Sequence, residues 1–337
     1  MRVLLYHHDV FAKHDTGPWH PERPERLVAA VEGVLRSGLE VVRKEPDRVP
    51  YEILWGVHEL PYVRRIEQFC KTGGGALDAD TVVSEDSWDA ALRAAGAGLN
   101  AVAALRAGEA ECAFLALRPP GHHARASEAM GFCLFNNIAV TATTLAAAGE
   151  RVAIIDWDVH HGNGTQETFY EDGNVIYLSL HEFPFYPGTG WFDEDGDQDG
   201  SGHIVNLPFP ARTGGDVYAE AMERVMLPVI KEFDPHWVLV SSGFDAHQKD
   251  PLADQMLVDA DYGRMAAAVA SVAPASRTIF FLEGGYDLEA IEASAAAVLR
   301  GTAGLPFGDE APIDSPLRSH QILDLVAGKV IADWGLS

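Results

Sequence analysis

The stretch Ile154-Ile155-Asp156-Trp157-Asp158-Val159-His160-His161-Gly162-Asn163 completes an apolar run that begins at Val152. Side chains alternate between the two faces of a strand, so Asp156, Asp158 and His160 project to the same side. Carboxylates at the end of a buried strand carry a heavy desolvation penalty, which a bound cation removes. Mixed Asp and His ligands suit zinc or a similar divalent metal. The stretch therefore predicts a metal site, and the alternative is a solvated loop between a strand and a helix.

Six apolar segments are predicted strands, and several lack polar alternation, which is typical of parallel strands covered on both faces. They are residues 2–7, 112–117, 151–156, 175–180, 237–241 and 278–282. Predicted helices, mostly rich in alanine, are residues 88–107, 137–148, 217–232, 262–272 and 288–299, the last with Asp287 as its N-cap. This alternation predicts a single-domain α/β fold, an open, doubly wound, mostly parallel sheet with helices on both faces. We expect the domain to span residues 1–305, with residues 306–337 as a C-terminal extension packed on it.

The charge balance excludes one class of partner. The 337-residue chain has 50 acidic and 25 basic residues and a net charge of −25. This balance opposes direct nucleic-acid binding, which needs a positive surface. It favours cationic ligands through long-range steering, and the alternative is that the acidity serves solubility or a saline habitat.

The three cysteines, Cys70, Cys112 and Cys133, are scattered, which indicates reduced thiols rather than a disulfide framework or a thiolate zinc site. The first residues lack the pattern of a signal peptide, and no apolar run approaches the roughly 20 residues of a membrane span. We therefore expect a cytoplasmic protein with no membrane partner. The sequence leaves open whether it forms a homo-oligomer.

Three further predicted strands are followed by unusual polar motifs. These are Arg118-Pro-Pro-Gly-His-His123, Gly243-Phe-Asp-Ala-His247 and Glu283-Gly-Gly-Tyr-Asp287. In isolation, paired histidines also occur on loop surfaces, and Gly-Gly-Tyr also occurs in turns. In open α/β sheets, however, ligands bind outside the carboxyl ends of the strands. Four such motifs at strand ends predict one catalytic site.

Seven motifs within residues 1–303 resemble those of a known family. They are His20-Pro-Glu-Arg-Pro-Glu-Arg26, Arg118-Pro-Pro-Gly-His-His123, Gly131-Phe-Cys133 with Asn136-Asn137, Asp156-x-Asp-x-His-His-Gly-Asn163, Phe185-Tyr-Pro-Gly-Thr-Gly190, Gly243-Phe-Asp245 with Asp250-Pro251, and Glu283-Gly-Gly-Tyr286. The chain resembles the zinc-dependent histone deacetylases and their bacterial acetylpolyamine amidohydrolase and acetoin-utilisation relatives, which have the arginase/deacetylase fold. Gly243-Phe-Asp245 and Asn163 are more similar to class II than to class I.

The resemblance implies that Asp158, His160 and Asp245 hold one catalytic Zn²⁺. Three protein ligands leave positions open for water and a carbonyl, the pattern of a catalytic zinc site. Asp156 then accepts a hydrogen bond from His122, and Asn163 does the same for His123. The resemblance also implies a structural K⁺ beside the zinc. Its ligands would be Asp156, Ser179 and the backbone carbonyls of Asp158, His160 and Leu180.

The resemblance also implies catalytic roles. His123 would act as general base and then protonate the leaving amine, with His122 as its orienting partner. Tyr286 would donate its hydroxyl to the developing oxyanion. The substrate tunnel would be formed by Gly131, Phe132, Phe185, Tyr186, Leu252, Gly284 and Gly285, with Phe132 and Tyr186 as aromatic walls unless Phe185 takes the second place.

The function expected from these features is hydrolysis of acetyl or short acyl amides of lysine side chains. An acetylpolyamine or another small cationic acetyl-amide is the alternative substrate to an acetylated lysine peptide. Leu252 stands where some polyamine-selective relatives have Glu, and there is little room for an early-loop insertion between Phe11 and His20. An acid within residues 78–86 could still pair with a polyamine. The remaining alternatives are a catalytically inactive module that binds acylated ligands and a two-manganese ureohydrolase.

Overall fold

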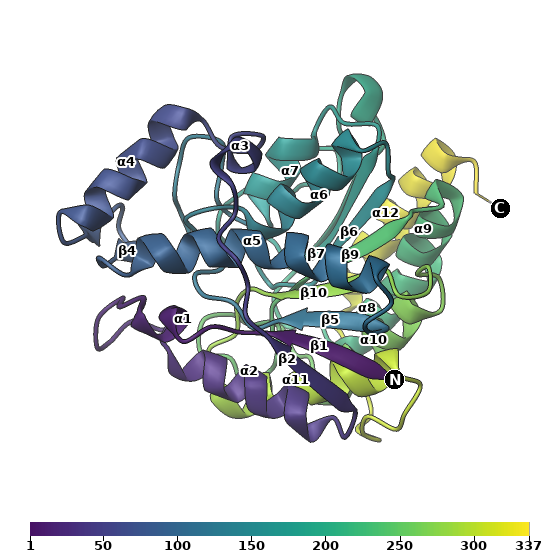
Figure 1. Ribbon diagram of the computed structural model, residues 1–337. Helices are drawn as coiled ribbons and strands as arrows, with labels where there is room; N and C mark the ends of the chain where they lie inside the picture. Colours follow the sequence, from purple (N-terminus) through teal and green to yellow (C-terminus); the bar gives the residue numbers. More distant parts are fainter. Residues whose placement is uncertain (337) are drawn as a thin grey trace.

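Eight strands form one sheet in the order β2-β1-β5-β10-β9-β6-β7-β8, and every neighbouring pair is parallel. The computed structural model describes residues 1–336 (Figure 1). The strands are β1 (Arg2–Tyr6), β2 (Glu40–Lys44), β5 (Cys112–Leu115), β6 (Val152–Asp156), β7 (Val175–Glu182), β8 (Ile204–Phe209), β9 (Trp237–Ser242) and β10 (Thr278–Leu282). The predicted single α/β domain with a parallel sheet is confirmed.

The two strands that sequence patterning missed, β2 and β8, lie at the two edges of the sheet. β2 has the sequence Glu-Val-Val-Arg-Lys, and its charged side chains suit an exposed edge. β8 contains Asn206 and Pro208, and proline is tolerated in edge strands because it lacks a backbone donor. Both strands therefore lack the continuous apolar run by which the six central strands were predicted.

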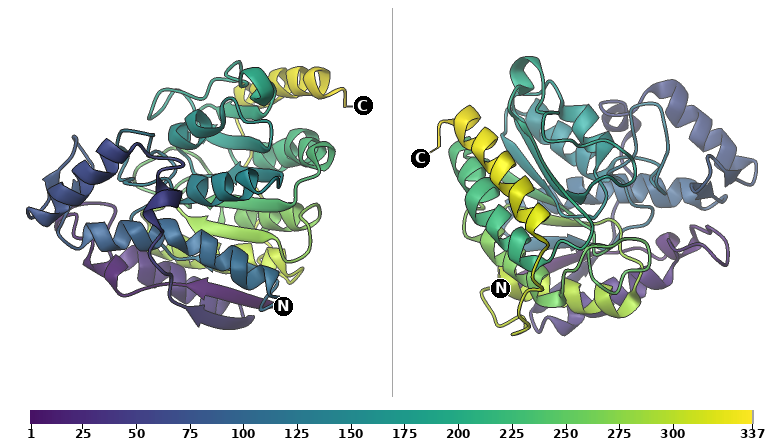
Figure 2. Two further views of the ribbon diagram at one scale, coloured as in Figure 1. Left: turned by 45° about the horizontal axis from the view of Figure 1, so that its top comes forward. Right: turned by 180° about the vertical axis from the view of Figure 1, so that it is seen from behind.

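Helices cover both faces of the sheet (Figure 1, Figure 2). On one face, α5 (Ser87–Arg106), α6 (Asn137–Ala147) and α7 (Asn163–Phe169) pack on the strands. On the other face, α10 (Asp259–Ala270) packs on α11 (Leu288–Thr302), which packs on α2 (Glu25–Arg36). None of the helices within residues 1–336 is both long enough and apolar enough to cross a bilayer.

Three short segments lie beyond the carboxyl ends of the strands (Figure 1). They are α1 (Val10–Lys13), α4 (Leu60–Lys71) and an antiparallel hairpin of β3 (Gly75–Ala76) and β4 (Val82–Val83). Two other short elements are α3 (Tyr51–Leu54), which contacts α6, and η1 (Gln198–Gly200), a single 3₁₀ turn. This end of the sheet therefore receives side chains from distant parts of the chain.

The helix predicted over residues 217–232 is present as one unbroken helical run with a π-helical turn in its middle. It consists of α8 (Gly215–Ala221), a π-helical turn η2 (Met222–Met226) and α9 (Leu227–Phe233). Pro228 lies in the first turn of α9, where its missing N–H leaves no broken hydrogen bond. The π-helical turn changes the hydrogen-bond register just before the proline. The backbone stays helical through this turn, so the sequence pattern is that of one helix.

The C-terminal helix α12 (Leu317–Trp334) packs against β8 and α8. Ser319 Oγ lies 2.7 Å from Thr213 Oγ1, and Leu323 and Val326 are buried in this contact region. The helix therefore shields one edge of the sheet. The domain boundary at residue 305 stays a prediction.

The N-cap predicted at the start of α11 is present, because the Asp287 side chain accepts a hydrogen bond from Ala290 N at 2.8 Å. We expect D287A to lower the free energy of unfolding by about 1 kcal/mol, the usual loss for an N-cap. Urea denaturation would measure the change. D287N is the matched control because asparagine caps equally well, and equal stability of D287A and wild type would contradict the prediction.

Candidate metal centre and active site

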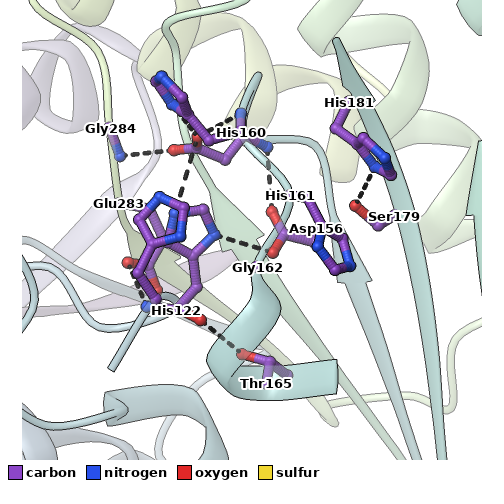
Figure 3. A network of polar contacts seen from close by, with 12 residues as sticks. His122, Asp156, His160, His161, Gly162, Thr165, Ser179, His181, Glu283 and Gly284 are labelled. Atoms are coloured by element: carbon purple, nitrogen blue, oxygen red, sulfur yellow. Dashed lines mark hydrogen bonds and ion pairs between the residues drawn. The ribbon is translucent and has the colours of Figure 1, made fainter. Parts of the chain in front are cut away.

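Four neighbouring strands, β5, β10, β9 and β6, end in the polar motifs that the sequence singled out. Register pairs Asp156 with Ser241, and Leu282 with Ser242, so the motifs that follow leave the sheet side by side. Figure 3 shows His122, Asp156, His160 and Glu283 gathered at this edge. The convergence predicted from the strand ends is therefore present.

Asp158, His160 and Asp245 place one ligand atom each within 4.8 Å of one another. His160 Nδ1 lies 3.1 Å from Asp158 Oδ1 and 3.2 Å from Asp245 Oδ2. Both carboxylates are fully buried, while the His160 side chain keeps 13% of its surface exposed. The triad thus forms a buried cluster that is open on the histidine side.

Backbone amides fix both carboxylates. Gly284 N–H donates to Asp158 Oδ2 at 2.7 Å, and Val159 N–H donates to Asp245 Oδ1 at 2.9 Å. A Cβ at position 284 would lie 2.0 Å from Asp245 Oδ2, so only glycine allows this approach. Each aspartate keeps its other oxygen directed toward His160.

The donor set fits a divalent metal. Asp245 Oδ2 is buried and has no hydrogen-bond partner among residues 1–336, and burial beside Asp158 raises the pKa of Asp245. Burial disfavours a charged His160, yet the carboxylates of Asp158 and Asp245 raise its pKa to about 10. The cluster therefore attracts a positive charge, and two oxygens and one nitrogen at this spacing suit zinc.

His122 makes the contact predicted for it. Its Nδ1 lies 3.0 Å from Asp156 Oδ2 (Figure 3). Burial disfavours the charged imidazole, but the carboxylates of Asp158 and Asp156 outweigh it and raise the pKa of His122 to about 10. His122 and Asp156 therefore form a buried charged pair.

His123 has a neutral partner. Its Nδ1 lies 2.9 Å from Asn163 Oδ1, and its ring lies edge-on to Tyr186 at 5.1 Å between centroids. Burial, followed by the charges on His122 and His160, lowers the pKa of His123 well below its usual value. The pKa values of the two adjacent histidines are therefore shifted in opposite directions, upward for His122 and downward for His123.

Tyr177 is a contact that sequence reasoning missed. Its hydroxyl donates to Asp156 Oδ2 at 3.0 Å and accepts from Gly162 N–H at 3.0 Å. Tyr177, Ser179 and His181 are polar groups at every second position of the buried strand β7, a signal that could have revealed them. Ser179 also lies opposite Asp156 in the β6–β7 register, and its Oγ lies 2.9 Å from His181 Nδ1 (Figure 3).

The loop that carries Tyr286 is held from the N-terminal part of the chain. The Arg26 guanidinium donates to the carbonyls of Glu283 and Gly285 and lies over the Tyr286 ring, 4.9 Å from its centroid. Glu22 pairs with Arg26 at 2.9 Å and also with Arg118. Burial raises the pKa of Tyr286 well above its usual value, so its hydroxyl keeps its proton at neutral pH.

The Glu283 side chain joins two of the strand-end motifs. Its Oε2 accepts hydrogen bonds from Gly121 N–H at 2.7 Å and from His122 N–H at 3.2 Å. Burial raises the pKa of Glu283 to about 7. This side chain fixes the backbone of the histidine pair against the end of β10.

A cavity of about 230 Å³ opens onto these groups. It is lined by Asp80, Pro120, His122, His123, Gly131, Phe132, Asp158, His160, Tyr186, Leu252, Gly284 and Tyr286. Phe185 and Gly285, also expected in the tunnel, lie outside this lining. The Phe185 ring stacks on His160 at 5.3 Å, and the Gly285 carbonyl faces Arg26. Of the two aromatic candidates for the second wall, Tyr186 therefore lines the cavity.

The parallel-sheet fold and the polar groups at its strand ends are of the deacetylase type, and the comparisons with known proteins agree. The family model described as the histone deacetylase domain matches residues 20–302. The chain belongs to the histone deacetylase family of deacetylases and amidohydrolases.

Similar proteins include a bacterial and an archaeal one. A protein named probable deacetylase from Archaeoglobus fulgidus is 40% identical over 290 residues, which cover 84% of this chain and 80% of that protein. The histone deacetylase-like amidohydrolase of Pseudomonas aeruginosa is 36% identical over 306 residues, covering 88% and 79%. The crystal structure of the HDA15 HD domain superposes with a TM-score of 0.90 at 34% identity, covering 98% of this chain and 97% of that one.

We expect D158A, H160A and D245A each to weaken metal binding by more than about 100-fold, because each removes a donor from a three-ligand site. Metal content after dialysis, measured by mass spectrometry, would show the loss. D254A, an exposed aspartate on the loop after Asp245, is the matched control. A variant that keeps one metal per chain and full turnover would remove that residue from the ligand set.

Proposed function

We propose that the protein is a zinc-dependent amidohydrolase that removes acetyl or other short acyl groups from lysine side chains. One observation carries the proposal: two metal-triad members, both histidines and Tyr286 line the same cavity of about 230 Å³. Zinc, when bound by Asp158, His160 and Asp245, would supply a Lewis acid that polarises the amide carbonyl and acidifies a water. The overall reaction consumes one water and gives a carboxylate and a free amine.

His123 acts as the general base in this proposal. Its lowered pKa keeps it neutral at working pH, so it can accept the proton of the attacking water and return it to the leaving amine. Asn163 fixes the ring through Nδ1 and leaves Nε2 for the reaction. The His122–Asp156 pair orients its neighbour and stays charged throughout.

Tyr286 acts as the oxyanion donor. Its hydroxyl keeps its proton, and its ring is held between Arg26 at 4.9 Å and Phe132 at 5.9 Å. A preorganised donor of this kind stabilises the charge that develops on the carbonyl oxygen. Gly284 lets the backbone pass close to the metal ligands beneath it.

The cavity walls suit an extended alkyl chain. Phe132 and Tyr186 supply aromatic surface, and Leu252 supplies an apolar rim that is 37% exposed. A lysine side chain buries its methylene stem along such surfaces while its acylated end reaches the metal site.

We also infer a structural K⁺ held by Asp156, Ser179 and the carbonyls of Asp158, His160 and Leu180, supported by the register that pairs Asp156 with Ser179.

A small cationic acetyl-amide is the second candidate substrate, and one observation favours it. Asp80 lies in the cavity lining, within the stretch 78–86 where the sequence left room for an acid that pairs with a polyamine. The test compares kcat/KM for an acetyl-lysine peptide with that for N-acetylputrescine and N8-acetylspermidine. A preference above about tenfold for the polyamines, or 1.4 kcal/mol in transition-state binding, would select the second candidate.

The same assay decides between an enzyme and its non-hydrolytic alternatives. One zinc per chain and turnover of either substrate support the proposal. Binding of acylated ligands without turnover would support an inactive binding module, and two manganese ions per chain would support a ureohydrolase.

We expect Y286F to keep KM within about threefold and to lower kcat by about 100-fold or more, as expected for loss of an oxyanion donor. Steady-state kinetics on an unactivated acetamide would measure both constants. Y51F, at an exposed tyrosine outside the cavity lining, is the control. Equal turnover by Y286F and wild type would exclude the hydroxyl from catalysis.

We expect N163D to move the acidic limb of the pH–rate profile to higher pH. A carboxylate beside Nδ1 favours the charged imidazole and raises the pKa of His123, so less neutral base is present at a given pH. The pH dependence of kcat/KM would show the shift. N174D adds the same charge at an exposed position, and an N163D limb that matches it would contradict the role given to Asn163.

A further inference from the structure

Asp250 is a nearly buried carboxylate with a contact on each oxygen. Only 7% of the surface of Asp250 is exposed. Its Oδ2 accepts a hydrogen bond from Tyr286 N–H at 2.7 Å, and its Oδ1 accepts one from Leu252 N–H at 3.0 Å. The backbone N–H of Asp250 donates to the His247 carbonyl at 2.8 Å, which fixes the backbone from which this side chain extends.

The two amides that Asp250 joins belong to opposite ends of the cavity. Tyr286 is 8% exposed and lies beside the metal ligands, whereas Leu252 is 37% exposed at the rim. They are separated by more than thirty positions in the sequence and lie on different loops. One rigid carboxylate therefore sets the distance between the rim and the hydroxyl donor.

The peptide unit that precedes Tyr286 is held at both of its polar groups. Its carbonyl, on Gly285, accepts from Arg26, and its N–H, on Tyr286, donates to Asp250. Gly285 has a φ of +112°, a conformation that favours glycine. Because glycine is conformationally permissive, this residue does not by itself fix the backbone conformation of the turn. These two contacts therefore fix the peptide unit from which the Tyr286 side chain projects, while Arg26 and Phe132 contact its ring.

An aspartate is the side chain that this bridge requires. A carboxylate offers acceptors on both oxygens, so it can receive two N–H donors at once. An asparagine has one acceptor oxygen and would present an NH₂ group to the second donor. Hydrogen bonds to a carboxylate are also stronger than those to a neutral amide.

We propose that Asp250 is a positioning residue that couples the pocket rim at Leu252 to the hydroxyl donor Tyr286. The coupling rests on the proposed role of Tyr286. The position of the rim and the position of the hydroxyl donor are thereby linked through one carboxylate.

The experiment uses the zinc-loaded full chain and the variants D250A, D250N, Y286F and D250A/Y286F. Hydrogen–deuterium exchange followed by mass spectrometry reports the Leu252 and Tyr286 amides without any turnover. Steady-state kinetics on an acetyl-lysine peptide give kcat and KM. D254A is the matched control, because Asp254 contacts its surroundings through its backbone N–H and carbonyl.

We expect D250A to speed exchange at both amides, to raise KM through the rim, and to lower kcat by about ten- to a hundredfold through a misplaced Tyr286. In the Y286F background the same change should lower kcat by less than about twofold, because both substitutions act on one interaction. D250N should keep one amide protected and recover part of kcat, which a general loss of folding would not produce.

Unchanged exchange at Tyr286 in D250A, or kcat losses that multiply in the double variant, would overturn the coupling. If D250A does not fold, exchange in D250N decides, and full protection of both amides there would also overturn it. A wild-type protein that fails to hydrolyse any acyl-amide would instead refute the proposed function, while the exchange data would still test whether Asp250 places Tyr286.

Discussion

The burial of negative charge at one edge of the sheet is the constraint on which the rest of the structure depends. The carboxyl groups buried there include five around the metal centre, on Asp156, Asp158, Asp245, Asp250 and Glu283. Isolated charges in such an interior are strongly disfavoured, so each must be balanced by a donor or a cation. Backbone N–H groups contact each of the five carboxyl groups. Two of these donors belong to glycines, Gly121 and Gly284, at positions where a Cβ would clash with neighbouring atoms.

The N-terminal part of the chain completes the site from a distance. Glu22, Arg26 and Arg118 are fully buried and form a cluster with one net positive charge. Burial opposes ionisation of Glu22, but Arg118 and Arg26 outweigh it and lower its pKa to about 2. Arg26 extends from this cluster to the carbonyls of the Tyr286 loop. The motif that begins at His20 therefore acts as a brace between α2 and the loop after β10.

Sequence patterns predicted the central strands and the metal-ligand motif because both follow from local rules. Buried parallel strands read as apolar runs, and strand alternation predicted Asp156, Asp158 and His160 on one side. In the structure β6 ends at Asp156, so Asp158 and His160 reach the site from the turn that follows the strand. The place of Asp80 in the cavity lining depends on how the β3–β4 hairpin, which is distant in sequence from the strand-end motifs, packs over the cavity. No local sequence pattern encodes that contact. The choice between Phe185 and Tyr186 was open for a similar reason, since both lie in an irregular loop after β7, where the strand period no longer applies.

The charge balance of the site itself argues for a divalent cation. Asp158 and Asp245 together bring two negative charges and His160 a neutral nitrogen, so a doubly charged ion leaves the triad neutral. Asp156 and His122 neutralise one another behind it. His123 then faces an electrically balanced cavity with Asn163, a neutral group, at its back. In the proposed mechanism, the carboxylate behind His122 and the amide behind His123 separate orientation from proton transfer in this pair.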